Sequence, residues 1–214
     1  MKYEAIIFDL DGVICHTDVY HYEAWKAIAD KLKIPFDKAI NNRLRGVSRR
    51  ESFEIILEQY NGKLTEEEIE QYISEKNEIY KKLLGNMTPA DLAPEVKDTL
   101  DTLRAGGLRL AIGSSSKNAR FILERLGLSN YFDAISDGTN ITHSKPDPEV
   151  FLKASEYVGV PTWKCLVVED AVAGLQAAVS GGMDCAGISD AAKSNLATYQ
   201  LTHFSDLLKK GVAL

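Results

Sequence analysis

From residue 87 onward, short apolar runs alternate with segments of helical periodicity, and this alternation limits the fold more than any other feature. We predict strands in LRLAIGSSS (108–116), FDAIS (132–136), KCLVVED (164–170) and DCAGIS (184–189), the last being the final strand. Segments 95–107, 117–127, 147–159 and 171–182 have the apolar spacing of helices, and each ends at a glycine. Strands that alternate with helices predict a parallel sheet with helices on both faces.

Residues 16–86 break this alternation. Segments 21–32, 49–60 and 65–84 are helical in period, and no run between them is typical of a strand. We therefore predict an all-helical cap inserted after the first strand, above the carboxyl edge of the sheet. The predicted domains are a discontinuous α/β core with a Rossmann-like sheet, residues 1–15 and 87–214, and a helical cap domain, residues 16–86.

The first strand is predicted in the run AIIFDLDGVI (5–14), where buried apolar residues lead into Asp9, Asp11 and Gly12. Open α/β sheets bind their ligands at the carboxyl ends of the strands, so this position favours a functional site. Taken alone, Asp-x-Asp-Gly is as typical of a polar turn or of the first part of a calcium loop as it is of such a site.

Three more polar clusters follow predicted strands, namely GSSSKN (113–118), SKPDPE (144–149) and VVEDAVAG (167–174). Each has a plain structural alternative: a serine loop that caps a helix, a lysine before a proline turn, and acids favoured by a helix start. Together they suit phosphoryl transfer, which needs a carboxylate nucleophile and several groups that neutralise phosphate. Asp9, Glu169 and Asp170 would supply the oxygen ligands that Mg²⁺ prefers.

The composition of the chain limits the classes of binding partner to expect. A net charge of −6 argues against nucleic acid or an anionic membrane as the main partner. The three cysteines are far apart and form no CxxC pair, so we expect reduced, buried thiols. The N-terminal residues lack the pattern of a signal peptide, and no run is long enough to span a membrane. We expect a cytoplasmic monomer that acts on small molecules.

DLDGV, the serine of GSSSKN, the lysine of SKPDP and VEDAVAG resemble the four ordered motifs of the haloacid dehalogenase superfamily. The resemblance extends over essentially the whole chain, and the helical insertion resembles the superfamily's first type of cap. It implies that Asp9 is the nucleophile, that Asp11 is the general acid and base, and that Ser114 and Lys145 bind the transferring phosphoryl group. The implied metal ligands are Asp9, Asp11 (through its carbonyl), Glu169 and Asp170.

Within the superfamily, the cap and core segments are most similar to sugar phosphomutases. This similarity implies that Arg49 clamps the distal phosphate, that His21 helps to position Asp11 and that Thr17 lies in a hinge. The substrate-binding residues implied in this way are Thr17, His21, Trp25, Gly46, Val47, Ser48, Arg49, Ser52, Lys76, Ser116, Lys117 and Asn118.

Three functions follow as hypotheses. The first is a mutase that interconverts beta-D-glucose 1-phosphate and D-glucose 6-phosphate, with one Mg²⁺ per site and beta-glucose 1,6-bisphosphate as activator. The second is a phosphatase of small sugar phosphates, in which water attacks the same aspartyl phosphate. The third, a binding module without turnover, would not require both Asp9 and Asp11.

One departure from the family pattern stands out. Relatives usually have Thr-Asp-Thr where this chain has Cys15-His16-Thr17. The change is either a tolerated surface substitution or one that alters cap motion or pH dependence, because histidine changes charge near neutrality.

Overall fold

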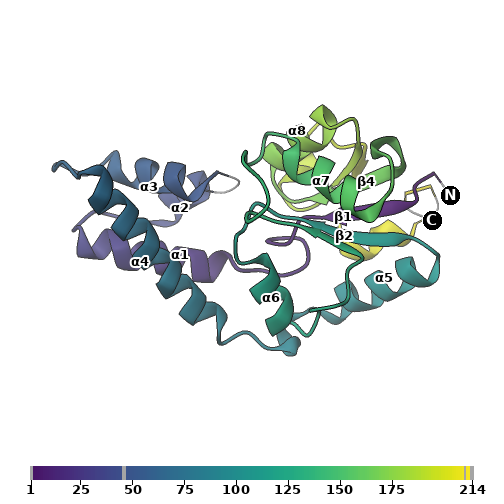
Figure 1. Cartoon of the computed structure of the whole chain (residues 1–214), viewed down its shortest axis with the longest axis horizontal. Helices are drawn as coiled ribbons and strands as arrows, with labels where there is room; N and C mark the ends of the chain where they lie inside the picture. Colours follow the sequence, from purple (N-terminus) through teal and green to yellow (C-terminus); the bar gives the residue numbers. More distant parts are fainter. Residues whose placement is uncertain (1, 45–46, 210, 213–214) are drawn as a thin grey trace. The chain divides into compact units, whose positions relative to one another are not determined.

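A computed structural model describes residues 2–44, 47–209 and 211–212 (Figure 1). The chain divides into two compact units. The core unit comprises the chain up to His16 and from Thr88 onward, and the cap unit comprises Thr17–Met87. Each unit is described by itself. No helix among the described residues has the length and apolar character needed to span a membrane.

The core unit contains a six-stranded sheet in the order β3-β2-β1-β4-β5-β6, and every neighbouring pair is parallel. The parallel sheet predicted from the alternation is confirmed. The prediction that 184–189 holds the final strand is wrong, because a sixth strand pairs with the edge of β5. At two residues this strand is too short to give a periodic signal. The strands are β1 (Ala5–Phe8), β2 (Arg109–Gly113), β3 (Ala134–Ser136), β4 (Cys165–Glu169), β5 (Asp184–Gly187) and β6 (Tyr199–Gln200).

Helices cover both faces of this sheet, as predicted. Figure 1 shows α7 (Glu149–Val158) and α8 (Val172–Ser180) on one face and α5 (Pro94–Ala105) on the other, with α6 (Ala119–Arg125) on the side of α5. The strand order explains this arrangement, because right-handed crossovers toward β3 and toward β5 leave their helices on opposite faces. Short 3₁₀ turns η1 (Pro89–Asp91), η2 (Thr162–Lys164), η3 (Ala191–Lys193) and η4 (Phe204–Leu208) join these elements.

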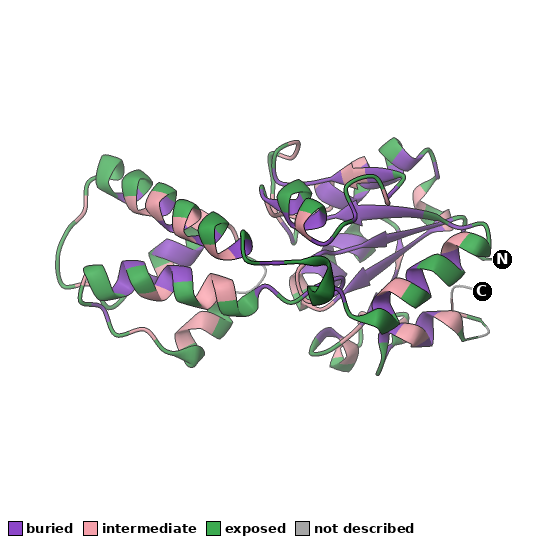
Figure 2. Cartoon of the chain, turned by 90° about the horizontal axis from the view of Figure 1, so that it is seen from below, coloured by how far each residue is buried: buried purple, intermediate pink, exposed green. Residues whose placement is uncertain are grey.

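The sheet is buried on both sides, as Figure 2 shows for its strands. On the face of α7 and α8, Ile7 packs in a cluster with Val167 and Phe151. On the other face Phe8 stacks on Phe204, with ring centroids 5.7 Å apart. Burial on both faces explains why β1 reads as an unbroken apolar run rather than an alternating one. Cys15, Cys165 and Cys185 are free and buried, as expected.

The cap unit consists of the helices α1 (Asp18–Lys31), α2 (Lys38–Arg43), α3 (Arg49–Leu57) and α4 (Glu66–Leu84). Both α3 and α4 begin at a capping box, in which Ser48 pairs with Glu51 and Thr65 with Glu68. The sequence predicted three helices and missed α2. This helix has six residues and buries none of them, so it lacks the apolar stripe on which the prediction depended.

A separate apolar core holds the cap helices together. It includes Trp25 and Ile28 of α1, Phe53 of α3 and Ile73 of α4. Trp25 stacks on Phe53 with the rings nearly parallel and 5.7 Å apart. Most charged residues of these helices are exposed or half-buried. Figure 2 shows the exposed parts of the helices in green.

Candidate functional site

The carboxyl ends of β1 and β4 lie side by side at the centre of the sheet. Phe8 pairs with Val168, and the Asp9 N–H donates to the Val168 carbonyl at 2.9 Å. Asp9 directly follows β1, and Glu169 is the last residue of β4. Both carboxylates therefore lie at the same edge of the sheet. From β1 the chain adds strands on one side, β2 and β3, and from β4 it adds strands on the other side, β5 and β6. Open α/β sheets form their ligand crevice at such a switch point.

Lys145 joins these two acids. Its Nζ lies 2.5 Å from Asp9 Oδ1 and 2.5 Å from Glu169 Oε1, and all three side chains are buried. The ammonium also lies 4.7 Å from the centroid of the Phe151 ring, which supplies a cation–π contact from α7. A buried amine thus neutralises part of the negative charge at the sheet edge.

Burial and neighbouring charges shift the pKa values of Lys145 and Glu169 in opposite directions. Burial alone would lower the pKa of Lys145, but the Asp9 and Glu169 carboxylates outweigh it and raise the pKa above its usual value. For Glu169, burial raises the pKa, and the Lys145 ammonium opposes that shift. Lys145 therefore stays protonated at neutral pH and keeps a positive charge at this edge of the sheet.

Two glycines make room for the carboxylates. Gly12 has a φ of +90°, and a Cβ there would overlap the Asp170 carboxylate. A Cβ on Gly174, in the first turn of α8, would overlap the Glu169 carboxylate. The glycines of DLDGV and VEDAVAG are thus explained by close packing against acids, in addition to turn geometry.

Asp9, Glu169 and Asp170 form a carboxylate cluster that suits a metal ion. One oxygen from each lies within 4.8 Å of the others. An all-oxygen donor set of this kind fits a hard divalent cation such as Mg²⁺. Asp11 lies in the turn after β1. There the Gly12 N–H donates to the Cys15 carbonyl at 2.7 Å, and Asp11 forms an isolated parallel β-bridge with Cys15.

The serine loop is held at the end of the neighbouring strand β2. Ser114 is buried, and its N–H donates to the Ser136 carbonyl of β3 at 3.0 Å. Its hydroxyl accepts the Ser116 N–H at 3.2 Å, and the Ser116 hydroxyl accepts the Asn118 N–H at 3.2 Å. Asn118 is buried, whereas Lys117 is exposed. The loop is therefore ordered by its own hydroxyls at the start of α6.

In the cap unit, a second group of predicted site residues is brought together. Lys76 of α4 is buried and donates a hydrogen bond to His21 Nδ1 at 2.9 Å. Its Nζ also lies 4.9 Å from the Trp25 ring centroid and 4.6 Å from that of Tyr80. His21 stacks on Tyr80 with centroids 4.1 Å apart. Because Nδ1 accepts the hydrogen bond from Lys76, the neutral imidazole carries its own proton on Nε2.

This cap cluster has a positive potential. Burial, followed by the charges of Lys76 and Arg49, lowers the pKa of His21 well below its usual value. Burial also lowers the pKa of Arg49, the first residue of α3. A histidine kept neutral beside two cations marks a region in which an anion would be stabilised.

The other predicted cap residues have varied positions. Ser52 and Thr17 are buried, Val47 is exposed, and Ser48 accepts the Glu51 N–H as the N-cap of α3. Gly46 lies outside the described residues. Exposed His16 precedes the cap unit, and Cys15 is buried with its pKa raised by burial and by nearby acids.

Sequence reasoning missed two aromatic rings that hold the lysines. Tyr80 lies one helical turn after Lys76, and the i, i+4 spacing could have identified it as a neighbour. Phe151 supports Lys145 from α7, and no local pattern in the sequence identifies that contact. The aromatic side chains in both places act as uncharged supports for a buried ammonium.

Comparisons with known proteins agree with this geometry. The family model of haloacid dehalogenase-like hydrolases matches residues 3–182. The chain is 43% identical over 188 residues to the beta-phosphoglucomutase of Bacillus subtilis, covering 86% of this chain and 83% of that protein. It is 31% identical over 184 residues to a phosphorylated carbohydrates phosphatase of Thermotoga maritima, covering 85% and 82%. The crystal structure of a beta-phosphoglucomutase from Clostridium difficile superposes with a TM-score of 0.89 at 36% identity, covering 96% and 93%.

Proposed function

The chain belongs to the haloacid dehalogenase-like hydrolase family, and from this premise we propose that it is a beta-phosphoglucomutase. It interconverts beta-D-glucose 1-phosphate and D-glucose 6-phosphate through an aspartyl phosphate on Asp9. Beta-glucose 1,6-bisphosphate is the bound intermediate and the activator. The net reaction is an isomerisation, in which phosphorylated Asp9 donates a phosphoryl group to one end of the sugar phosphate and takes one back from the other end.

The observation that carries this proposal is the position of the Lys145 ammonium, 2.5 Å from Asp9 Oδ1 at the carboxyl end of the central strands. Asp9 attacks the phosphorus, and Lys145 with the Ser114 hydroxyl binds the phosphoryl oxygens as their charge grows. Asp11, two residues beyond the nucleophile, takes the proton from the sugar hydroxyl and returns it to the leaving oxygen.

The carboxylates of Asp9, Glu169 and Asp170, with the Asp11 carbonyl, would hold one Mg²⁺. When bound, this ion supplies positive charge that neutralises the transferring phosphoryl group. Asp9 is then both a ligand and the nucleophile. The oxygen-only donor set supports this metal over zinc or copper.

The cap residues bind the rest of the substrate. Arg49 grips the phosphate that does not react, because its planar guanidinium can donate two parallel hydrogen bonds to phosphate oxygens. Lys76, His21 and Ser52 bind the sugar hydroxyls, with Trp25 beside them. Thr17 acts as the hinge. Val47 and Ser48 face the sugar, and Ser116, Lys117 and Asn118 bind the substrate from the core.

Phosphatase activity is the second candidate, and the similarity to the Thermotoga maritima phosphatase favours it. Both enzymes would use Asp9, so the fold and the nucleophile do not separate them. The identity of 43% to the Bacillus subtilis mutase against 31% to the phosphatase supports the mutase. We propose a cytoplasmic monomer that acts on sugar phosphates, a location in keeping with its three free cysteines.

One experiment separates the two activities. The protein is incubated with beta-glucose 1-phosphate, a trace of beta-glucose 1,6-bisphosphate and Mg²⁺, and glucose 6-phosphate and free phosphate are measured in parallel. The mutase forms glucose 6-phosphate with little free phosphate. Free phosphate as the main product would overturn the proposal in favour of a phosphatase.

A further inference from the structure

Lys145 reaches the site from an irregular segment. Residues 137–148 join β3 to α7 and contain neither helix nor strand. Segments without a backbone ladder are held by side chains and by turns. A buried ammonium that must stay 2.5 Å from two carboxylates therefore needs anchors elsewhere in this segment.

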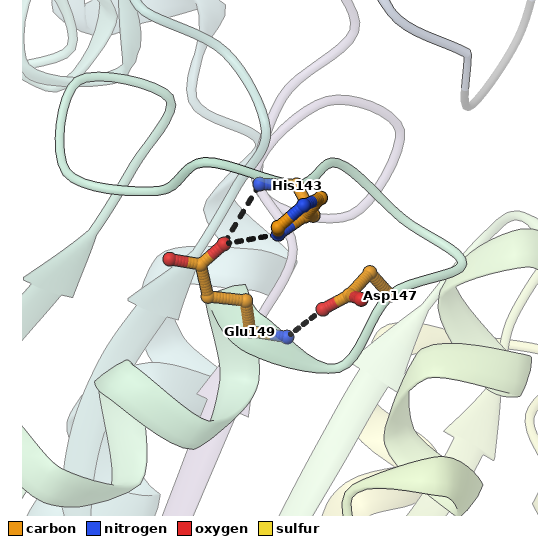
Figure 3. A group of neighbouring side chains, drawn as sticks. All are labelled: His143, Asp147 and Glu149. Atoms are coloured by element: carbon orange, nitrogen blue, oxygen red, sulfur yellow. Dashed lines mark hydrogen bonds and ion pairs between the residues drawn. The ribbon is translucent and has the colours of Figure 1, made fainter.

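Glu149, the first residue of α7, supplies such an anchor (Figure 3). Its Oε2 accepts the N–H of Thr142 at 2.8 Å and the N–H of His143 at 2.7 Å. One helical turn later, Lys153 Nζ lies 2.8 Å from Glu149 Oε1 and donates a hydrogen bond to the Asn140 carbonyl. These contacts fold residues 140–143 against the first turn of α7.

Glu149 is ionised at neutral pH. The hydrogen bond from Lys153 contributes most, and together with the backbone N–H groups of His143 and Thr142 it lowers the pKa of Glu149 to about 2. The start of a helix also favours a negative charge.

Figure 3 also shows why this group is better explained as a loop anchor than as a metal site. His143, Asp147 and Glu149 lie close enough to share one ion. Both oxygens of Glu149, however, already accept hydrogen bonds or pair with Lys153, and Asp147 Oδ1 accepts the Glu149 N–H at 2.9 Å. The three side chains thus satisfy the backbone at the beginning of α7.

The same helix also supports Lys145 directly. Phe151, two residues after Glu149, is fully buried, and its ring lies 4.7 Å below the Lys145 ammonium. One helical turn therefore holds the backbone on the N-terminal side of Lys145 through Glu149 and the Lys145 side chain through Phe151.

We infer that Glu149, assisted by Lys153, is a positioning residue for phosphoryl transfer. It fixes residues 140–143 on α7 and so sets the place of the Lys145 ammonium between Asp9 and Glu169. This inference rests on the proposed function, in which Lys145 binds the transferring phosphoryl group. Misplacing such a group by about 1 Å can slow a reaction by about a hundredfold.

The test measures the rate at which Asp9 is phosphorylated by acetyl phosphate, a small donor that both a mutase and a phosphatase would use. We expect Glu149→Ala to lower this rate about tenfold to a hundredfold, and Glu149→Gln to lower it less, because an amide still accepts the Thr142 and His143 N–H groups. The control is Glu156→Ala, which removes an exposed acid from the same helix and should react at the unmodified rate.

A double-mutant cycle separates positioning from a general loss of structure. If Glu149 acts through Lys145, then Glu149→Ala slows the unmodified protein but has no further effect on Lys145→Ala. An equal loss on both backgrounds would overturn the inference. Should Glu149→Ala fail to fold, Lys153→Met removes the contact to Asn140 and should show the same non-additivity, with a loss of about threefold.

The outcomes also distinguish this inference from the proposed function. If the unmodified protein is not phosphorylated on Asp9, the proposed function is wrong, and the inference fails with it. If the unmodified protein is phosphorylated and Glu149→Ala and Lys153→Met, both folded, react as fast, only the positioning role is wrong.

Discussion

Among the described residues, the core buries Lys145 and the cap buries Lys76, and the two lysines are stabilised in different ways. Lys145 of the core lies 2.5 Å from two carboxylates and over one aromatic ring. Lys76 of the cap lies 2.9 Å from a neutral histidine nitrogen and within 5 Å of the centroids of two aromatic rings. Burying an amine costs free energy in both places, because the charge loses its hydration.

The difference indicates what each lysine can do. The Lys145 charge balances fixed acids, so it can hold a phosphoryl group close to a negatively charged nucleophile. Burial, and after it the charges of Lys76 and Arg49, lower the pKa of His21, so two cations lie near this histidine in the cap. We therefore expect the core cation to serve the transfer step and the cap cations to serve recognition of an anionic substrate.

The largest effect should come from the nucleophile. Asp9→Asn replaces the attacking carboxylate by an amide and weakens the metal site, so the rate of phosphoprotein formation should fall by about a thousandfold or more. Acid-stable phosphoprotein after incubation with labelled acetyl phosphate is the measurement. Asp30→Asn, which changes an exposed acid of α1, is the control. A normal level of phosphoprotein in Asp9→Asn would contradict the assignment.

Removal of the metal should have the next largest effect. Excess chelator should abolish activity, and added Mg²⁺ should restore it. Asp170→Ala should raise the Mg²⁺ concentration needed for half-maximal activity by about tenfold to a hundredfold, because one carboxylate ligand is lost. Asp190→Ala removes an acid that pairs with Lys193 and should leave this concentration unchanged. Full activity in excess chelator would show that the carboxylate cluster is structural.

Arg49→Ala tests whether the cap binds the phosphate that does not react. A charge-assisted bidentate contact is worth roughly 1.5 to 3 kcal/mol, so mutase kcat/KM should fall about tenfold to a hundredfold. Phosphorylation of Asp9 by acetyl phosphate should be unaffected. The neighbouring Arg50 is the matched control, because its guanidinium is occupied by Glu54, Glu66 and Glu70. Equal losses in Arg49→Ala and Arg50→Ala would argue against a phosphate site at Arg49.

The smallest effect concerns pH. His21 has a lowered pKa in the folded cap, so below about pH 6.5 the unfolded chain binds a proton that the folded cap does not. The stability contributed by neutral His21 is complete above that pH and is lost as the pH falls. The loss should not exceed about 2 kcal/mol at pH 5.

Urea unfolding at pH 7.5 and at pH 5 measures this contribution. His21→Gln should reduce the difference in unfolding free energy between the two pH values. His16→Gln, which replaces an exposed histidine, serves as the control. If His21→Gln and the unmodified protein lose the same free energy on acidification, the electrostatic description of the cap is wrong.

The sequence predicted the parts of the molecule that depend on local pattern. Acids that follow buried strands could be placed at one edge because parallel strands end on the same side of the sheet, and Asp9 and Glu169 do meet there. The strand β6 and the helix α2 were missed because neither is long enough or buried enough to leave a period. The contacts of Glu149 with Thr142 and His143 were also beyond prediction, since they depend on how an irregular segment folds back on a helix.

The most direct test of the two lysine sites compares Lys145→Met with Lys76→Met in two half-reactions. The first half-reaction is phosphorylation of Asp9 by acetyl phosphate, and the second is transfer from phosphorylated Asp9 to beta-glucose 1-phosphate. Melting temperatures would establish that both variants are folded. We predict that Lys145→Met slows both half-reactions and that Lys76→Met slows only the second. If Lys76→Met slows the reaction with acetyl phosphate as much as Lys145→Met does, the two lysines do not have separate roles.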